Sequence, residues 1–136
     1  MPMSVPELAV QLKNTPGQLV EVTAVLAEAG VNVDAITASS AGKTGWIRLI
    51  VDKPKIAMEA LDECGIHAEA GEALAVLLED IPGSLDRTLR ILADARINVD
   101  YIYICPHKAP KTKLIIGVQT PSKAEKLLKQ NSIEVL

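Results

Sequence analysis

The 136-residue chain contains no phenylalanine, and its tryptophan and tyrosine residues are limited to Trp46, Tyr101 and Tyr103. Nucleic-acid binding draws on aromatic platforms for base stacking and on a basic surface for phosphates, whereas the net charge here is −3. We therefore expect no general nucleic-acid binding. The two cysteines, Cys64 and Cys105, are too few for a disulfide framework or a four-cysteine zinc site.

The sequence also lacks the long apolar runs of membrane proteins. No stretch reaches the roughly 18 apolar residues that a membrane-spanning helix needs. The first ten residues do not combine a basic region with a long apolar run, so no signal peptide is expected. Apolar residues nevertheless make up 49% of the chain, which argues against disorder. These features predict a soluble protein of a reducing compartment and hence a cytoplasmic location, with no membrane partner.

The chain contains an internal duplication. When residues 8–38 are set against residues 74–104, 14 of the 31 positions are identical. The matches include Pro16-Gly17 with Pro82-Gly83 and Asn32-Val33-Asp34 with Asn98-Val99-Asp100. A shift of one residue then aligns the remainder of the two copies. This order of matches predicts two domains, residues 1–70 and residues 71–136.

Each copy is predicted to follow the order strand–helix–strand–strand–helix–strand. Alternating residues over positions 8–13 predict the first strand, and a helix with 3.6-residue spacing follows it. A hairpin loop is expected over residues 40–45, and Pro54 and Pro121 stand where second helices begin. This βαββαβ order is that of the ferredoxin-like fold, an α+β fold of four antiparallel strands with two helices on one face.

Apolar stripes mark the helix faces that we expect to be buried. The first helix of the first copy has Leu19, Val22, Leu26 and Ala29 on its stripe, and Leu85, Leu89 and Leu92 repeat this stripe in the second copy. Cys64 falls on the stripe of the following helix and is predicted to be a packed core residue. The second cysteine, two positions before His107, has too few neighbouring ligands for a tetrahedral metal site.

The turn after the first strand is the most informative local feature. It reads Asn14-Thr15-Pro16-Gly17-Gln18-Leu19 in one copy and Asp80-Ile81-Pro82-Gly83-Ser84-Leu85 in the other. An Asn or Asp near a helix N-terminus can accept hydrogen bonds from free backbone N–H groups. The positive end of the helix dipole also suits a ligand carboxylate. A helix-capping turn without a ligand is the alternative, and on local sequence alone it is favoured.

A second motif opens the next strand of each copy, with the sequences Asn32-Val33-Asp34-Ala35-Ile36 and Asn98-Val99-Asp100-Tyr101-Ile102. Strand periodicity places Asn32, Asp34 and Ile36 on one face. These polar groups either fix the helix-to-strand turn or hold an ammonium or amide group of a ligand. Tyr101 and Tyr103 share the opposite face of their strand, and we interpret them as contacts between domains or chains.

Together the two motifs resemble the ACT domain. The pattern of that family is an apolar strand, Asn/Asp-x-Pro-Gly-x-Leu, an amphipathic helix, and Gly-Ile/Val-Asn-Ile/Val at the start of the second strand. The first copy matches this pattern closely from Leu12 to Ile36. The second copy departs from it at Arg96, where the pattern has glycine, so that turn is expected to differ. The resemblance covers essentially the whole chain.

The resemblance implies a regulatory protein with no catalytic residue, no metal and no cofactor. ACT domains usually bind an amino acid or similar small metabolite where two such domains meet, and they pass that occupancy to an attached or partner enzyme. A homo-oligomer, most simply a dimer, is expected. The residues carried over by position as ligand-binding are Asn14, Thr15, Pro16, Gly17, Gln18, Leu19, Asn32, Val33, Asp34, Ile36, Asp80, Ile81, Pro82, Gly83, Ser84, Leu85, Asn98, Val99, Asp100 and Ile102.

Four functions remain open at this point. We rank an amino-acid sensor first and a regulatory subunit of a separate amino-acid-metabolism enzyme second. A structural pairing module with no ligand is third, and a small enzyme of the acylphosphatase kind is last. That chemistry would want an arginine cradle in the first turn, which has none. The fold alone does not choose among these functions.

The duplicated turns generate a first testable prediction. Asp80 is anionic where Asn14 is neutral, so the first turn should be the better acceptor for a ligand carboxylate. We expect Asn14→Ala to weaken the binding of a carboxylate ligand more than Asp80→Ala does, as measured by calorimetry. A larger loss of affinity in the Asp80→Ala variant would contradict this prediction.

Overall fold

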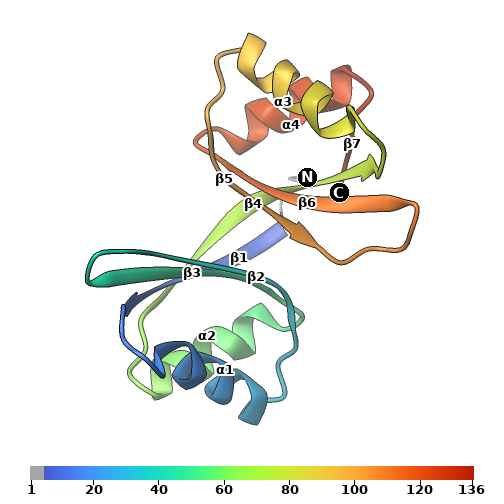
Figure 1. The fold of residues 1–136 in the computed structure, drawn as a ribbon. Coiled ribbons are helices and arrows are strands. Elements are labelled where there is room, and N and C mark those ends of the chain that lie inside the picture. Colours follow the sequence, from blue (N-terminus) through green and yellow to red (C-terminus); the bar gives the residue numbers. More distant parts are fainter. Residues whose placement is uncertain (1–4) are drawn as a thin grey trace. The chain divides into compact units, whose positions relative to one another are not determined.

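The computed structural model describes residues 5–136, which divide into two compact units. The first unit comprises residues 6–71, and the second comprises residues 72–136 together with Val5. In each unit two helices cover one face of a set of antiparallel strands (Figure 1). The predicted α+β, ferredoxin-like architecture is therefore confirmed, and it occurs twice.

The first unit contains β1 (Val5–Lys13) from Pro6 onward, α1 (Gln18–Glu28), β2 (Val33–Ala41), β3 (Thr44–Val51), α2 (Pro54–Glu63) and the first residues of β4 (Ala68–Glu79). β3 lies between β1 and β2 and pairs antiparallel with both. Leu8 of β1 and Ile36 of β2 both pair with Leu49 of β3, so these three residues share one face of the strands.

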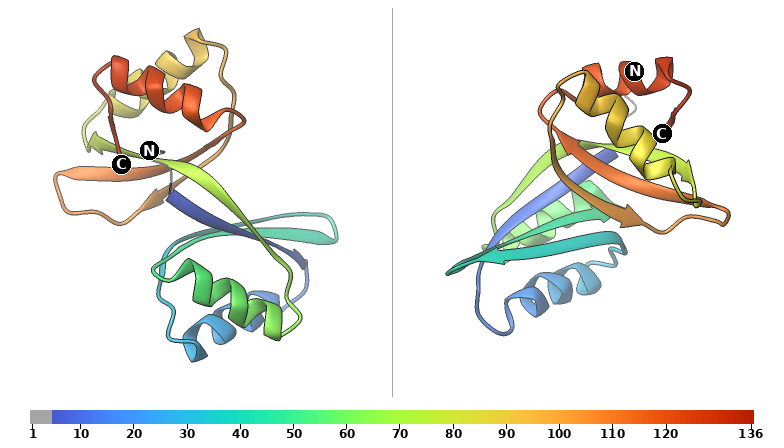
Figure 2. Two further views of the ribbon diagram at one scale, coloured as in Figure 1. Left: turned by 180° about the vertical axis from the view of Figure 1, so that it is seen from behind. Right: turned by 45° about the horizontal axis from the view of Figure 1, so that its top comes forward.

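The second unit continues along β4 and contains α3 (Ser84–Asp94), β5 (Val99–Cys105), β6 (Lys111–Val118), α4 (Pro121–Gln130) and β7 (Glu134–Val135). β6 pairs with β4 and β5, and β7 pairs with β4. The order β5-β6-β4-β7 is antiparallel throughout. The views in Figure 2 show α3 and α4 together on one side of these strands. Among residues 5–136, no helix is both long and apolar enough to span a bilayer.

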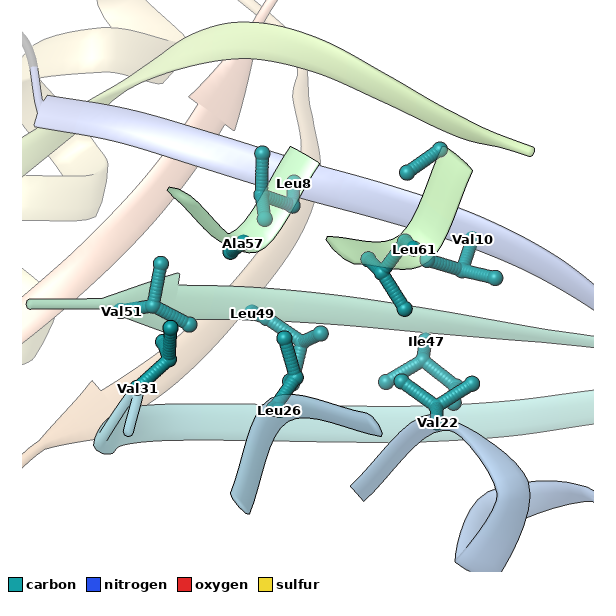
Figure 3. Close-up of a cluster of buried hydrophobic side chains, with 11 residues drawn as sticks. Leu8, Val10, Val22, Leu26, Val31, Ile47, Leu49, Val51, Ala57 and Leu61 are labelled. Carbon is teal, nitrogen blue, oxygen red and sulfur yellow. The ribbon is translucent and has the colours of Figure 1, made fainter. Parts of the chain in front are cut away.

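Each unit has its own aliphatic core between its helices and its strands. In the first unit, Val22 and Leu26 of α1 and Leu61 of α2 point toward Ile47 and Leu49 of β3 (Figure 3). All five of these side chains are almost completely buried. The second core is built in the same way from the buried residues Leu74, Val76, Leu78, Leu92, Leu114, Ile116, Ala124 and Leu128. Small aliphatic side chains therefore suffice to close both cores.

Three details of the helix stripes differ from the prediction. The exposed fractions of Leu19 and Leu85 are 46% and 44%, because each lies in the first turn of its helix, beyond the residues that face the core. The buried positions of α3 are Thr88 and Leu92, whereas Leu89, which the prediction placed on the buried stripe, is only half-buried. The prediction that Cys64 is a core residue is wrong: Cys64 follows the last turn of α2 as its C-cap and is exposed.

The bounds of the strands also differ from the prediction. The expected loop over residues 40–45 shrinks to a two-residue turn, Gly42-Lys43, because Gly42 adopts a positive φ of 65° that permits a tight hairpin. β2 and β5 begin one residue later than expected, at Val33 and Val99. The pairing register of each strand shifts within its first three residues, which marks a β-bulge at both strand entries.

Tyr101 and Tyr103 stack on each other, with ring centroids 6.2 Å apart. Tyr101 pairs with Gly117 across β5 and β6, and a Cβ atom at position 117 would overlap the Tyr101 ring. Glycine at this position thus makes room for the tyrosine. The role of the two tyrosines as contacts between domains or chains stays a prediction.

The second unit holds two residues other than glycine in the left-handed region of backbone conformation. Arg96 has a φ of 60° and Ser132 a φ of 62°, whereas Gly30 and Gly65 occupy the equivalent places of the first unit with φ of 72° and 73°. All four follow the end of a helix, where glycine is the preferred residue. The departure of Arg96 from the family pattern therefore keeps the backbone turn and adds conformational strain.

We expect Arg96→Gly to stabilise the protein by about 0.5–1 kcal/mol, because glycine adopts a positive φ without the steric cost of a Cβ atom. The greater freedom of glycine in the unfolded chain offsets part of that gain. Urea unfolding followed by circular dichroism measures the change. Ala95→Gly is the matched control, since Ala95 has a φ of −89° and should gain nothing from glycine. A midpoint for Arg96→Gly at or below that of the unmodified protein would contradict the prediction.

Candidate functional site

A cavity of about 300 Å³ lies in the first unit beside the turn between β1 and α1. Its wall combines the turn itself, the end of β1, and the hairpin end of β2 and β3. The lining residues are Leu12, Lys13, Asn14, Thr15, Pro16, Gly17, Gln18, Leu19, Ala38, Ser39, Ser40, Gly45, Trp46 and Ile47. The six turn residues predicted from the sequence thus border one cavity.

The backbone of Gly17 shapes this turn. Gly17 has a φ of 89° and is the N-cap of α1, which begins at Gln18 without a side-chain cap. The Gln18 N–H donates to the Thr15 carbonyl at 3.4 Å, and the first backbone bond along the helix runs from the Glu21 N–H to the Gly17 carbonyl at 3.1 Å. The N–H groups of the intervening residues in such a first turn have no partner within the helix. They are available to a bound acceptor.

Asn14 acts differently from the prediction. Its side-chain Nδ2 donates to the Gly42 carbonyl at 2.9 Å, and its backbone N–H donates to the Lys43 carbonyl at 2.8 Å. Asn14 therefore ties the turn to the β2–β3 hairpin, and it does not cap the helix. The interpretation of Asn14 as an acceptor for helix N–H groups was wrong, since α1 has no side-chain cap. The partner of the Asn14 side chain lies 28 residues away in the sequence, which local sequence does not indicate.

The hairpin side of the cavity was not predicted from the sequence. Ala38 pairs with Ile47, whose side chain belongs to the core, so Ala38 shares the helix-facing side of the strands. Side chains alternate along a strand, which assigns Ser39 and Trp46 to the other side, and we infer that they border the cavity through their backbone. The small side chain of Ala38 leaves this wall open. Sequence analysis missed these residues because it does not give the pairing register of β2 and β3.

A second cavity of about 240 Å³ lies in the second unit at the equivalent turn, between β4 and α3. Its lining residues are Leu78, Glu79, Asp80, Ile81, Ser84, Leu85, Ile104, Thr112 and Leu114. Gly83 repeats the backbone of Gly17, with a φ of 94°, as the N-cap of α3. The Asp80 N–H donates to the Pro110 carbonyl at 3.0 Å, which repeats the tie between turn and hairpin.

The two cavities differ in chemistry at matching positions. Glu79 and Asp80 stand where the first unit has Lys13 and Asn14. Ile104 replaces Ala38, and Ile81 replaces Thr15. Leu12 and Leu78 face the cores, so the side chains of Lys13 and Glu79 alternate to the other side of their strands. The first cavity therefore offers an amide beside the helix N-terminus, whereas the second offers the Asp80 carboxylate and a more apolar wall.

The strand-entry residues do not line either cavity. Asn32 donates from Nδ2 to Asp34 Oδ1 at 2.8 Å and from its backbone N–H to Asp52 Oδ1 at 2.9 Å. Asn98 repeats the first bond, to Asp100 Oδ1 at 3.1 Å. These bonds fix the turns into β2 and β5, which is a structural role. A ligand role for Asn32, Val33, Asp34, Ile36, Asn98, Val99, Asp100 and Ile102 stays a prediction that requires a second domain.

A further cavity of about 270 Å³ in the second unit is polar. Within it the Lys111 ammonium contacts Glu134 at 2.9 Å, and this hydrogen bond, with the attraction of Glu134 and Glu79, raises the pKa of Lys111 above its usual value. Arg87 donates from Nη2 to the Asn131 carbonyl at 2.8 Å. These contacts tie β6 to β7 and α3 to the end of α4. Within residues 5–136, no three His, Cys, Asp or Glu side chains gather in a way that could hold a metal ion.

Comparison with known proteins places the chain among characterised folds. A family model described as an ACT domain pair matches residues 3–136. No curated protein matches the chain significantly.

Three solved structures resemble the chain over nearly its whole length. The protein BT0572 from Bacteroides thetaiotaomicron is 25% identical with a TM-score of 0.91, over 98% of this chain and 92% of that chain. The ligand-free regulatory subunit of aspartate kinase from Thermus thermophilus is 20% identical with a TM-score of 0.65, over 93% and 91%. The corresponding subunit from Thermus flavus is 18% identical with a TM-score of 0.61, over 92% and 90%. The two kinase subunits show a shared fold.

Proposed function

We propose that this chain, which belongs to the ACT domain family and contains a pair of such domains, binds an amino acid or similar small metabolite in the cavity of its first unit and acts as a regulatory protein. The family is a regulatory one. The proposed site consists of the turn residues Asn14–Leu19 with the hairpin wall around Ala38.

One observation carries the proposal: a cavity of about 300 Å³ opens directly at the N-terminus of α1. This volume is at the lower end of the range for small-molecule pockets. Unpaired N–H groups and the positive end of the helix dipole favour a carboxylate there. Leu12 and Leu19 form an aliphatic wall of the cavity, which the rest of a small ligand would contact.

Occupancy must reach another part of the system for the chain to regulate anything. A ligand shifts an equilibrium between two arrangements only if it binds them with different affinity. We propose that a second ACT domain contributes the strand-entry residues to the ligand, and that a homodimer in the cytoplasm supplies such pairing. The residues concerned, among them Asp34 and Asp100, are already held in place by hydrogen bonds from Asn32 and Asn98.

A regulatory subunit of a separate enzyme is the second candidate function. It is favoured by the likeness to regulatory subunits of aspartate kinase, which extends over at least 90% of both chains. Because that likeness concerns the fold, it does not identify the enzyme. Co-purification of a partner enzyme with the tagged chain from its native cytoplasm would support this alternative over a free-standing sensor.

We expect a thermal-shift screen of the proteinogenic amino acids to show stabilisation by a small number of them. A ligand at 100 times its dissociation constant adds about 2.7 kcal/mol to the folded state, which is readily visible as a higher melting temperature. The amide NMR signals of residues 14–19 should shift with the same ligand and saturate at the same concentration. Stabilisation by none of the amino acids would contradict the amino-acid proposal.

A matched pair of variants locates the binding. Ala38→Ile should weaken ligand binding, because the branched side chain narrows the cavity at its hairpin wall, and the second unit, which holds Ile104 at this position, has the smaller cavity. Thr37→Ile is the control, since Thr37 pairs with Arg48 on the other side of β2. Equal loss of binding in both variants would argue against this cavity as the site.

A further inference from the structure

We propose that the cavity of the second unit is a separate site for a compact aliphatic ligand that has no free carboxylate, such as an aliphatic alcohol or amine. The inference rests on the proposed function in one respect: it takes the turn cavity of an ACT domain as a place where ligands bind. It assigns the second cavity a different ligand class from the first. The chain would then respond to two different molecules.

The wall of the second cavity supplies the first argument. Leu78 and Leu114 are 8% and 5% exposed and form an apolar floor. Around them Ile81, Leu85 and Ile104 are 57%, 44% and 66% exposed, so large aliphatic side chains face solvent at the border of the cavity. An exposed group of apolar side chains that surrounds a cavity is typical of a binding site.

Substitutions between the two units make this wall specific to the second cavity. Ile104 and Ile81 stand where the first unit has Ala38 and Thr15. The larger side chains accompany a smaller volume, about 240 Å³ against about 300 Å³. Each exchange at these positions replaces a small or polar side chain by a branched aliphatic one. A compact aliphatic group therefore fits the second cavity better than a polar ligand does.

Charge supplies the second argument. Asp80 lines the second cavity where the first has the neutral Asn14, and no lysine or arginine is among its lining residues. The N-terminus of α3 carries the equivalent of about half a positive charge, which is smaller than the full negative charge of Asp80. A ligand carboxylate is therefore disfavoured in this cavity.

Three probes with the same branched skeleton test the inference. Isoamyl alcohol is neutral, isoamylamine is a cation at neutral pH, and isovalerate is an anion. We expect the alcohol and the amine to shift the amide NMR signals of residues 80–85 in a saturable way, and isovalerate to leave them unchanged. Isovalerate binding there as tightly as the alcohol, or no binding of either the alcohol or the amine, would overturn the proposal.

Two variants separate the apolar and the charge arguments. Ile104→Ala should weaken binding of the alcohol about three- to tenfold through the loss of apolar contact, whereas the control Ile56→Ala, at an exposed position of α2, should not. Asp80→Asn should weaken binding of the amine about two- to fivefold and let isovalerate bind. Unchanged affinities in both Ile104→Ala and Asp80→Asn would contradict the assignment.

Two further outcomes are distinguishable. If the signals of residues 80–85 change with protein concentration and the probes have no effect, the apolar border is an interface between copies of the chain, and the proposal is wrong. The proposed function is tested separately, because its readout is the response of residues 14–19 to amino acids. The response of residues 80–85 to the three probes can therefore be absent while residues 14–19 respond to an amino acid, and the reverse is also possible.

Discussion

The backbone of Gly17 and Gly83 is the constraint on which both candidate sites depend. Each glycine has a positive φ near 90° and ends the turn that follows a strand, so that the next helix starts beside the strands. The first helical turn consequently extends past the core, which leaves Leu19 and Leu85 exposed and a cavity beneath them. A Cβ atom at either glycine would meet no other atom within 4 Å, so the requirement is conformational and not one of space.

Much of the fold could be predicted from the sequence because the duplication repeats each local signal. The Pro-Gly turns and the prolines that begin α2 and α4 are local features, and the structure places them as expected. The hairpin wall of the first cavity could not be predicted, since the pairing of Ala38 with Ile47 depends on strand register and on a two-residue turn. The bond from Asn14 to Gly42 was missed for the same reason, because it joins two turns that are far apart in the sequence.

The two units share a backbone plan and have diverged in their side chains. Residues 1–70 carry a net charge of −4 and residues 71–136 a net charge of +1. Around the turn cavities the local change has the opposite sign, because Lys13 and Asn14 give way to Glu79 and Asp80. Overall charge therefore says little about either cavity. The proposed difference in ligand class rests on a few side chains at the N-terminus of one helix and on one residue of the neighbouring strand.

The left-handed residues Arg96 and Ser132 have a consequence for how the second unit opens. A glycine at either place would remove this strain, and the net gain is about 0.5–1 kcal/mol because glycine has more freedom in the opened chain. That difference changes an equilibrium roughly two- to fivefold. Local opening at the ends of α3 and α4 is therefore more frequent than it would be with glycine there, and amide hydrogens in those turns should exchange sooner. A ligand that binds only the closed second unit would therefore have a lower apparent affinity, because this strain shifts the equilibrium toward the open form.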